Sequence, residues 1–341
     1  MSNNVKPNEI IFLDFIDGCD ENVYISDYWK FNYGIDANKT INRLINLGYL
    51  TFKSDVTKNV FKSTIPQLKE VLKENDLKVT GKKQELAERV LGNIDTDYLE
   101  RKFNKKLFSL TFAGEQLIKN NNLYIINKKK NYMLTNKEIK DAYMLGDEYS
   151  DSDRLWSILN KRNITFPSQK KWSSYRSNLL NIGELLFQEN KYEQSLQFYV
   201  AVFIIDLSGL TEDNYVNDID SLFVARGIIK SIKSLISLCE YKTEDVMNLI
   251  SGNVFCSVLP FRYYSNSTLV KILLDCLNDI EFSHKRYPHN TPSKNNPKYT
   301  YYGFYEDNQF DSEILENTIT INSSSLKKKS FLSSFFELFM K

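Results

Sequence analysis

Histidine and glycine are scarce in this sequence. Its 341 residues include 2 histidines and 12 glycines. A histidine nucleophile or general base is therefore not expected, and His284, His289 and nearby Cys276 fit no usual zinc spacing. The glycines form no phosphate-binding loop. We predict neither a metal nor a cofactor, and we predict that the chain is not an enzyme.

Paired cysteines and long apolar runs are also missing. The four cysteines are scattered without a Cys-x-x-Cys pair, which indicates reduced thiols. No run reaches about 18 apolar residues, the length that spans a membrane. The start MSNNVKPNEIIFLDF lacks the charged segment, apolar core and cleavage site of a signal peptide. We therefore expect a cytoplasmic protein without a membrane-spanning helix.

Charge is nearly balanced overall but unevenly distributed. The net charge is +1. Residues 58–140 contain 18 basic and 10 acidic side chains, whereas residues 1–57 contain 5 and 8, and residues 141–341 contain 21 and 25. A basic segment between two acidic ones is compatible with nucleic-acid binding. A solvated lysine-rich surface fits the same numbers, so a motif has to decide between the two interpretations.

The first part of the chain has a mixed α/β pattern. Residues 10–16, IIFLDFI, form an apolar start. A helix is predicted around residues 39–47, capped by Asp36 or Asn38 and ended by Gly48, and a strand is predicted at 49–52. A helix, a glycine stop and an aromatic strand are typical of the end of a winged-helix unit, although many small α/β segments share the pattern.

Periodicity further along the chain predicts a mainly α-helical protein. Residues 107–118 favour a strand followed by a helix, and residues 141–282 are helical throughout. The predicted divisions are a winged-helix-like segment (1–62), a helix–extended loop–helix module (63–95), a strand–helix support with a basic connector (96–140), a helical domain (141–283), a flexible loop (284–325) and a basic–aromatic C-terminal helix (326–341).

The stretch from Thr64 to Asn93 predicts two short helices around an extended loop. Thr64 and Gln67 have the spacing of a capping box, with Pro66 in the first turn. Asn75 and Asp76 end the first helix because both tolerate left-handed backbone. The apolar and turn positions that complete the module are Leu68, Val71 and Leu72 on the first helix, Leu77 and Val79 in the loop, Gly81 before the second helix, and Leu86, Val90 and Leu91 on that helix.

Two lysines stand at the start of the second predicted helix. Positive charge there opposes the helix macrodipole at a cost of about 0.3–1 kcal/mol per residue. Lys82 and Lys83 make sense if an anion docks at this end, where backbone N–H groups and ammonium groups would converge on one phosphate. Arg89 lies about two turns further and is positioned to reach an adjacent phosphate.

The stretch resembles the SAP motif, a DNA-binding helix–extended loop–helix. The resemblance rests on the leucine spacing and on Gly81-Lys82-Lys83-x-x-Leu86-x-x-Arg89-Val90. Asp76 departs from the family, which usually has glycine before the loop leucine. The resemblance implies sequence-tolerant binding of double-stranded DNA, often with a preference for AT-rich DNA. The DNA-binding residues it implies are Lys69, Lys73, Lys78, Gly81, Lys82, Lys83 and Arg89.

Two broader resemblances concern the flanking regions. Residues 8–118 resemble the front half of SAP-containing proteins of Gram-positive bacteria and their phages, through YWKFNYGIDANKTINRLINLGYL and LTFAGEQL. Within residues 176–209, one segment resembles a single tetratricopeptide repeat. The matching positions are Gly183, Leu186, Tyr192, Ser195 and Tyr199, whereas Val202 replaces a small residue. A protein-binding or self-association surface and an ordinary helical bundle both remain open.

Three further patterns are compatible with ordinary surface segments. The carboxylates of Asp147, Glu148, Asp151 and Asp153 lack EF-hand spacing and fit a solvated loop. The 284–302 segment mixes cations and aromatics, a pattern that stacks on single-stranded bases or simply forms a surface loop. The Lys327–Lys329 run before an aromatic end fits an anionic membrane, the protein's own helical domain or a partner chain equally well.

The sequence supports three hypotheses in descending order. The first is a DNA-binding adaptor that holds duplex DNA through residues 64–93 and recruits a protein or a second copy through residues 141–341. The second is a protein-interaction scaffold with a vestigial SAP-like unit. The third is a DNA-processing enzyme whose active site in 141–341 is not recognisable from sequence.

Overall fold

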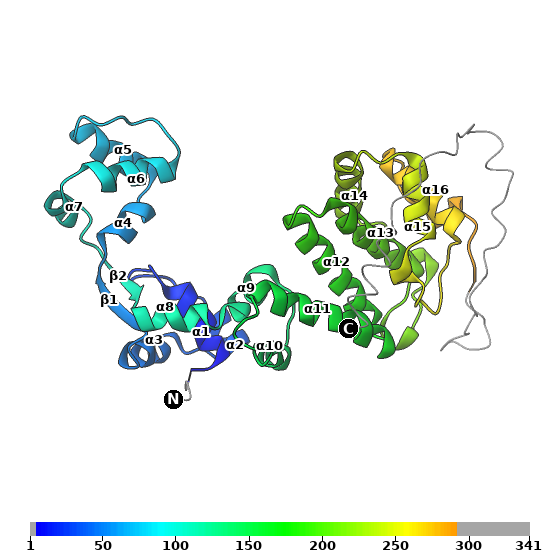
Figure 1. Cartoon of the computed structure of the whole chain (residues 1–341), viewed down its shortest axis with the longest axis horizontal. Coiled ribbons are helices and arrows are strands. Elements are labelled where there is room, and N and C mark those ends of the chain that lie inside the picture. Colours follow the sequence, from blue (N-terminus) through cyan, green and yellow to red (C-terminus); the bar gives the residue numbers. More distant parts are fainter. Residues whose placement is uncertain (1–4, 292–341) are drawn as a thin grey trace. The chain divides into compact units, whose positions relative to one another are not determined.

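A computed structural model describes residues 5–291 (Figure 1). The chain divides between Thr165 and Phe166 into two compact units. Both units are mainly helical, as the periodicity predicted, and within residues 5–291 the one sheet has two strands. The predicted C-terminal helix and most of the predicted 284–325 loop lie outside the described residues.

Unit 1 begins with three helices and a strand that share a hydrophobic core. They are α1 (Pro7–Ile16), α2 (Tyr28–Tyr33), α3 (Ala37–Asn46) and β1 (Leu50–Ser54). Asp36 caps α3 by accepting a hydrogen bond from the Lys39 N–H (3.1 Å), and Gly48 follows the helix with a φ of 77°. The predicted helix, glycine stop and strand are confirmed, with boundaries that shift by a residue or two.

The strand β1 pairs with a partner that lies far along the chain. β2 (Lys106–Leu110) runs antiparallel to β1, with Leu50 opposite Leu110 and Ser54 opposite Lys106. The intervening residues 55–105, which we call the inserted lobe, extend from the open end of this strand pair (Figure 1). The lobe comprises α4 (Val56–Lys62), α5 (Ile65–Glu74), α6 (Lys83–Asn93) and α7 (Thr96–Lys102).

The inserted lobe has a hydrophobic core of its own. Two short helices bury too little surface to be stable alone, so neighbouring helices are needed. The buried members are Leu68, Val71 and Leu72 from α5, Leu86, Ala87 and Val90 from α6, and Val60, Ile94, Leu99 and Phe103 from the flanking segments. The compact lobe is therefore wider than the predicted 63–95 division, because α4 and α7 complete its core.

After β2, unit 1 continues as helices. They are α8 (Phe112–Lys119), α9 (Asn122–Lys130), α10 (Asn136–Tyr143) and α11 (Asp151–Ser168). The second half of the predicted 96–140 division is not an exposed connector, because Leu123, Tyr124 and Ile125 are buried and α9 packs against α1. The three lysines at the C-terminal end of α9 favoured an exposed segment, and the apolar run before them is too short to indicate a buried helix.

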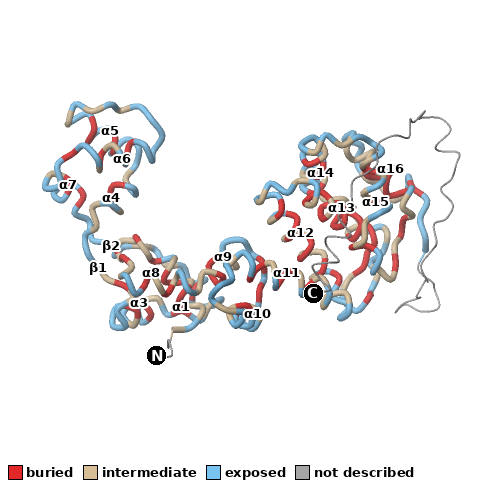
Figure 2. Tube along the Cα trace, viewed as in Figure 1, coloured by how far each residue is buried: buried red, intermediate tan, exposed pale blue. Residues whose placement is uncertain are grey.

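Unit 2 is built around one central helix. Its helices are α12 (Trp172–Gln188), α13 (Tyr192–Ser208), α14 (Arg226–Leu238), α15 (Thr243–Ser251) and α16 (Asn266–Leu277), with short 3₁₀ turns at Glu212–Asn214, Ile219–Ser221, Val254–Cys256 and His284–Arg286. Figure 2 shows α13 buried along most of its length. It contacts α12, α14 and α15, which makes this unit a helical bundle.

The helices α12 and α13 form a hairpin with a close crossing. Gly183 faces Tyr199, and a Cβ at Gly183 would lie 3.3 Å from that ring. The Ser195 hydroxyl donates to the Gly183 carbonyl at 2.7 Å. The small and aromatic residues that suggested a tetratricopeptide-like pattern therefore serve helix packing within the bundle.

Among the glycines of unit 1, Gly114 lies closest to another backbone segment, at Tyr49, and its replacement gives a stability prediction. A Cβ there would lie 2.1 Å from the Tyr49 carbonyl oxygen, so α8 would have to move away from β1. We expect Gly114→Ala to destabilise unit 1 by about 1–3 kcal/mol, measured as a lower thermal midpoint by circular dichroism.

The matched control is Gly92→Ala in α6, where a Cβ would meet nothing within 4 Å. This change should leave the stability unchanged or raise it by about 0.5–1 kcal/mol, because alanine restricts the unfolded chain more than glycine does. Equal midpoints for the two variants would contradict the close packing of α8 against Tyr49.

Candidate nucleic-acid interface

The first helix of the module, α5, begins at a capping box and is followed by a residue with left-handed backbone. The Thr64 N–H donates to Gln67 Oε1 (2.8 Å), and the Gln67 N–H donates to Thr64 Oγ1 (3.4 Å). This reciprocal pair is the predicted capping box. Asp76 has a φ of 53°, the left-handed backbone predicted for the end of α5. The chain therefore leaves α5 in a defined direction toward the extended loop.

The extended loop lies along α6 and is held there by Arg89. Leu77 and Val79 pack against the core of the inserted lobe. Arg89 Nη1 donates to the carbonyl oxygens of Lys78 (2.7 Å) and Thr80 (3.1 Å). Since one guanidinium nitrogen bonds two loop carbonyls, Arg89 positions the loop as well as adding charge to it.

The two lysines flank the start of α6. Lys82 is the residue before the helix and Lys83 is its first residue. Gly81 enters this turn with a φ of 139°, a backbone conformation that favours glycine. Both lysines are exposed, and neither forms an ion pair with any of residues 5–291. Their ammonium groups therefore face solvent, where an anionic ligand has access to them.

Glu85 changes how an anion would meet this helix end. Its Oε2 accepts a hydrogen bond from the Lys82 N–H at 3.2 Å. A backbone donor expected to face a phosphate is thus bonded to the protein's own carboxylate. Glu85 also offsets the unfavourable position of the lysines relative to the helix dipole. This helix end therefore offers an anion its lysine side chains rather than the Lys82 N–H, and the three-residue Lys82-to-Glu85 spacing was the overlooked sequence signal.

Positive charge is concentrated in the loop rather than spread over the lobe. Residues 77–84, LKVTGKKQ, contain Lys78, Lys82 and Lys83 and no acidic residue. We call residues 77–84 the lysine loop. Because its three lysines are exposed and follow each other along one held segment, the loop presents a row of cations suited to a polyanion.

The other two predicted lysines lie on a different surface of the lobe. Lys69 and Lys73 are exposed on α5, where Glu70 and Glu74 alternate with them. Hydrogen bonds from Tyr98 and then from Lys102 hold the pKa of Glu74 below its ordinary value. Glu74 therefore stays charged beside Lys73 and joins α5 to α7, so the α5 surface is less positive than the lysine loop.

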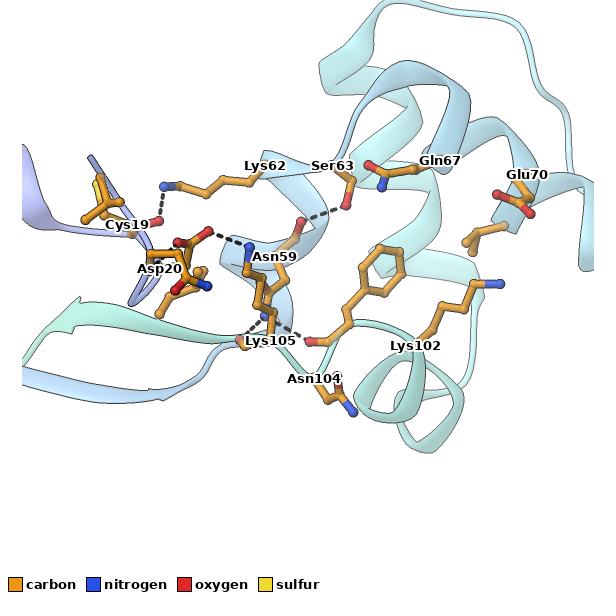
Figure 3. Close-up of a pocket in the computed structure, with 16 residues that line it drawn as sticks. Cys19, Asp20, Asn59, Lys62, Ser63, Gln67, Glu70, Lys102, Asn104 and Lys105 are labelled. Atoms are coloured by element: carbon orange, nitrogen blue, oxygen red, sulfur yellow. Dashed lines mark hydrogen bonds and ion pairs between the residues drawn. The ribbon is translucent and has the colours of Figure 1, made fainter. Parts of the chain in front are cut away.

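A cavity of about 710 Å³ lies where the inserted lobe joins the rest of unit 1 (Figure 3). Lys62 donates to the Gly18 carbonyl, and Lys105 pairs with Asp20. The Asn59 side-chain amide donates to the carbonyl oxygens of Phe103 (2.9 Å) and Lys105 (2.8 Å). The polar side chains here fasten α4 to the returning chain, so the cavity is part of the attachment of the lobe.

The histidines and carboxylates of the described residues form no metal centre. Among residues 5–291, no group of three or more His, Cys, Asp or Glu side chains is placed to hold a metal ion. His284 Nε2 instead lies 2.9 Å from Asp220 Oδ1, and His289 Nδ1 lies 3.2 Å from the Tyr287 carbonyl. None of the helices in this part of the chain combines the length and hydrophobicity needed to cross a membrane.

These features are those of a small helix–extended loop–helix module, in which a lysine-bearing loop connects two packed helices. Residues 59–95 match the family model of the SAP domain. SAP domains are generally DNA-binding modules, so the match supports a DNA-binding role for the inserted lobe. No curated protein matches the chain.

Arg89 gives a test of how the lysine loop is held. Arg89→Met replaces the guanidinium-bearing side chain with an unbranched apolar one. It therefore removes both hydrogen bonds to the loop carbonyls. We expect faster hydrogen exchange of the Leu77 and Lys82 amides, the two N–H groups of residues 77–82 that have acceptors, and a loss of about 1 kcal/mol of local stability, measured by hydrogen-exchange NMR.

Lys73→Met is the control for this experiment, since it removes an exposed cation from α5 without touching the loop. It should leave exchange in residues 77–82 at the wild-type rate. Unchanged exchange in Arg89→Met itself would show that Arg89 does not hold the loop.

Proposed function

We propose that this protein binds double-stranded DNA through the lysine loop of its SAP domain, with little dependence on base sequence. The observation that carries the proposal is the row of Lys78, Lys82 and Lys83, exposed on a loop that Arg89 holds against α6. Lysine ammonium groups bind phosphates as point charges and read no base edge, so the binding is sequence-tolerant. Lys69 and Lys73 lie at the margin and contribute less.

Unit 2 completes the proposed role as an adaptor. Its exposed apolar side chains include Phe223 (70% exposed) and Leu238 (52% exposed), which favour contact with a protein or a second copy of the chain. The role is binding without catalysis, because the family match is to a binding module, and we place it in the cytoplasm. Retention of a protein partner without salt-sensitive DNA binding would favour the scaffold alternative, and metal-dependent cleavage of plasmid DNA would favour an enzyme.

Neutralising the two lysines at the start of α6 tests the DNA-binding site. If three phosphates are contacted, the slope of log affinity against log salt for wild type should be about −2.7. We expect Lys82→Gln combined with Lys83→Gln to reduce it to about −0.9 and to weaken binding strongly at low salt. Fluorescence anisotropy with AT-rich and GC-rich duplexes across a salt series measures both quantities.

The matched comparison is Lys69→Gln combined with Lys73→Gln, which removes the same charge from α5. This pair should change the slope by less than the Lys82 and Lys83 pair does. Circular dichroism should be the same for both variants, because all four side chains are exposed. Equal salt slopes for the two variants would show that the change in slope depends only on the net charge of the protein. That result would reject the lysine loop as the binding site.

A further inference from the structure

An exposed aromatic surface lies in unit 1 outside the inserted lobe. On α2, Tyr28 and Phe31 are one helical turn apart and share a face. Phe31 is 79% exposed and Tyr28 is 44% exposed, whereas Trp29 on the opposite face is buried in the core. Phe31 is therefore largely in solvent, whereas Tyr28 is half-exposed and packs edge-on against Tyr33, with 5.6 Å between the ring centroids.

A lysine from another helix, Lys128 on α9, contacts the rings of Tyr28 and Tyr33 on α2. Lys128 Nζ lies 4.7 Å from the Tyr28 ring centroid and 4.8 Å from that of Tyr33. It also donates to the Tyr28 hydroxyl at 2.9 Å. The cation–π contacts and the hydrogen bond hold the ammonium group beside the exposed aromatic face. We call Tyr28, Phe31 and Lys128 the aromatic–lysine surface.

The charges around this surface favour an anionic ligand. Lys129 and Lys130 follow Lys128 at the end of α9, and Lys30 is exposed on α2. The nearby carboxylate of Asp14 pairs with Lys129 at 2.9 Å. The helix dipole accounts for lysines at a helix C-terminus, and a single exposed phenylalanine is ordinary by itself. What distinguishes this surface is that the lysine contacts an aromatic ring one helical turn from that phenylalanine.

We propose that the aromatic–lysine surface binds single-stranded nucleic acid. An aromatic ring stacks on any base whose face is free, and a lysine beside it neutralises the adjoining phosphate. In a duplex the base faces are covered by their neighbours, so these rings select an unpaired strand. A protein partner is less favoured, because lysine is depleted at the centre of protein interfaces. This surface is separate from the lysine loop and its binding does not depend on the duplex site.

Binding of fluorescein-labelled oligothymidine of about 20 nucleotides to the full chain tests the proposal. We expect salt-sensitive binding by wild type and binding about tenfold weaker for Phe31→Ala, from the loss of one stacked base. Lys128→Gln should also weaken binding and lower the salt slope by about 0.7. The matched control is Phe112→Ala, since Phe112 on α8 is equally solvent-exposed (77%) and should leave the affinity unchanged.

Two additional measurements separate single-strand binding at this surface from duplex binding and from membrane contact. Lys82→Gln combined with Lys83→Gln should lower duplex affinity more than Phe31→Ala does, and Phe31→Ala should lower oligothymidine affinity more than the double lysine variant does. These opposite orders let the two proposals fail independently. Absence of oligothymidine binding by wild type, or equal affinity of Phe31→Ala and Phe112→Ala, would overturn the proposal. Loss of binding to phosphatidylserine vesicles in Phe31→Ala without loss of oligothymidine binding would overturn it in favour of a membrane contact.

Discussion

The pairing of β1 with β2 is the constraint on which unit 1 depends. It brings together two strands separated by the whole inserted lobe, from Leu50 opposite Leu110 to Ser54 opposite Lys106. The ends of residues 55–105 are thereby fixed side by side, and the entropy of closing this long segment is lost in a single step. Asn59 strengthens the closure because its amide bonds the returning chain at Phe103 and Lys105. The lobe that matches the SAP domain is thus joined to the rest of unit 1 at both of its ends rather than by one flexible linker.

Much of the candidate site followed from the sequence because its signals are local. The Thr64 cap, the left-handed Asp76 and the positive φ of Gly81 each depend on residues within a few positions, so their types nearly determine the backbone. The same holds for the helix that ends at Gly48. Where the geometry is set within one or two turns, propensity and capping suffice to predict an element, and the SAP pattern consists almost wholly of such positions.

The remaining features depend on contacts between distant residues. No local pattern shows that Leu50 pairs with Leu110, or that Leu99 and Phe103 complete the core of the inserted lobe. The burial of Leu123, Tyr124 and Ile125 was likewise not predictable, because a run of four apolar residues beside a lysine run shows no periodicity, and its burial depends on packing against α1. The sequence predicted which segments are helical better than it predicted which of them share a core.

The cations of the SAP motif divide into two physical roles. Arg89 directs its hydrogen bonds to loop carbonyls, and arginine suits this because its planar guanidinium presents donors in a fixed geometry. Lys82 and Lys83 remain exposed, while Glu85 occupies the backbone donor beside them. The loop therefore carries exposed point charges on a held backbone. Under the proposed function such charges contact phosphates without fixing the register of the DNA, so one loop binds weakly and in a salt-sensitive way, and tight binding requires a second contact on the same chain or on a second copy.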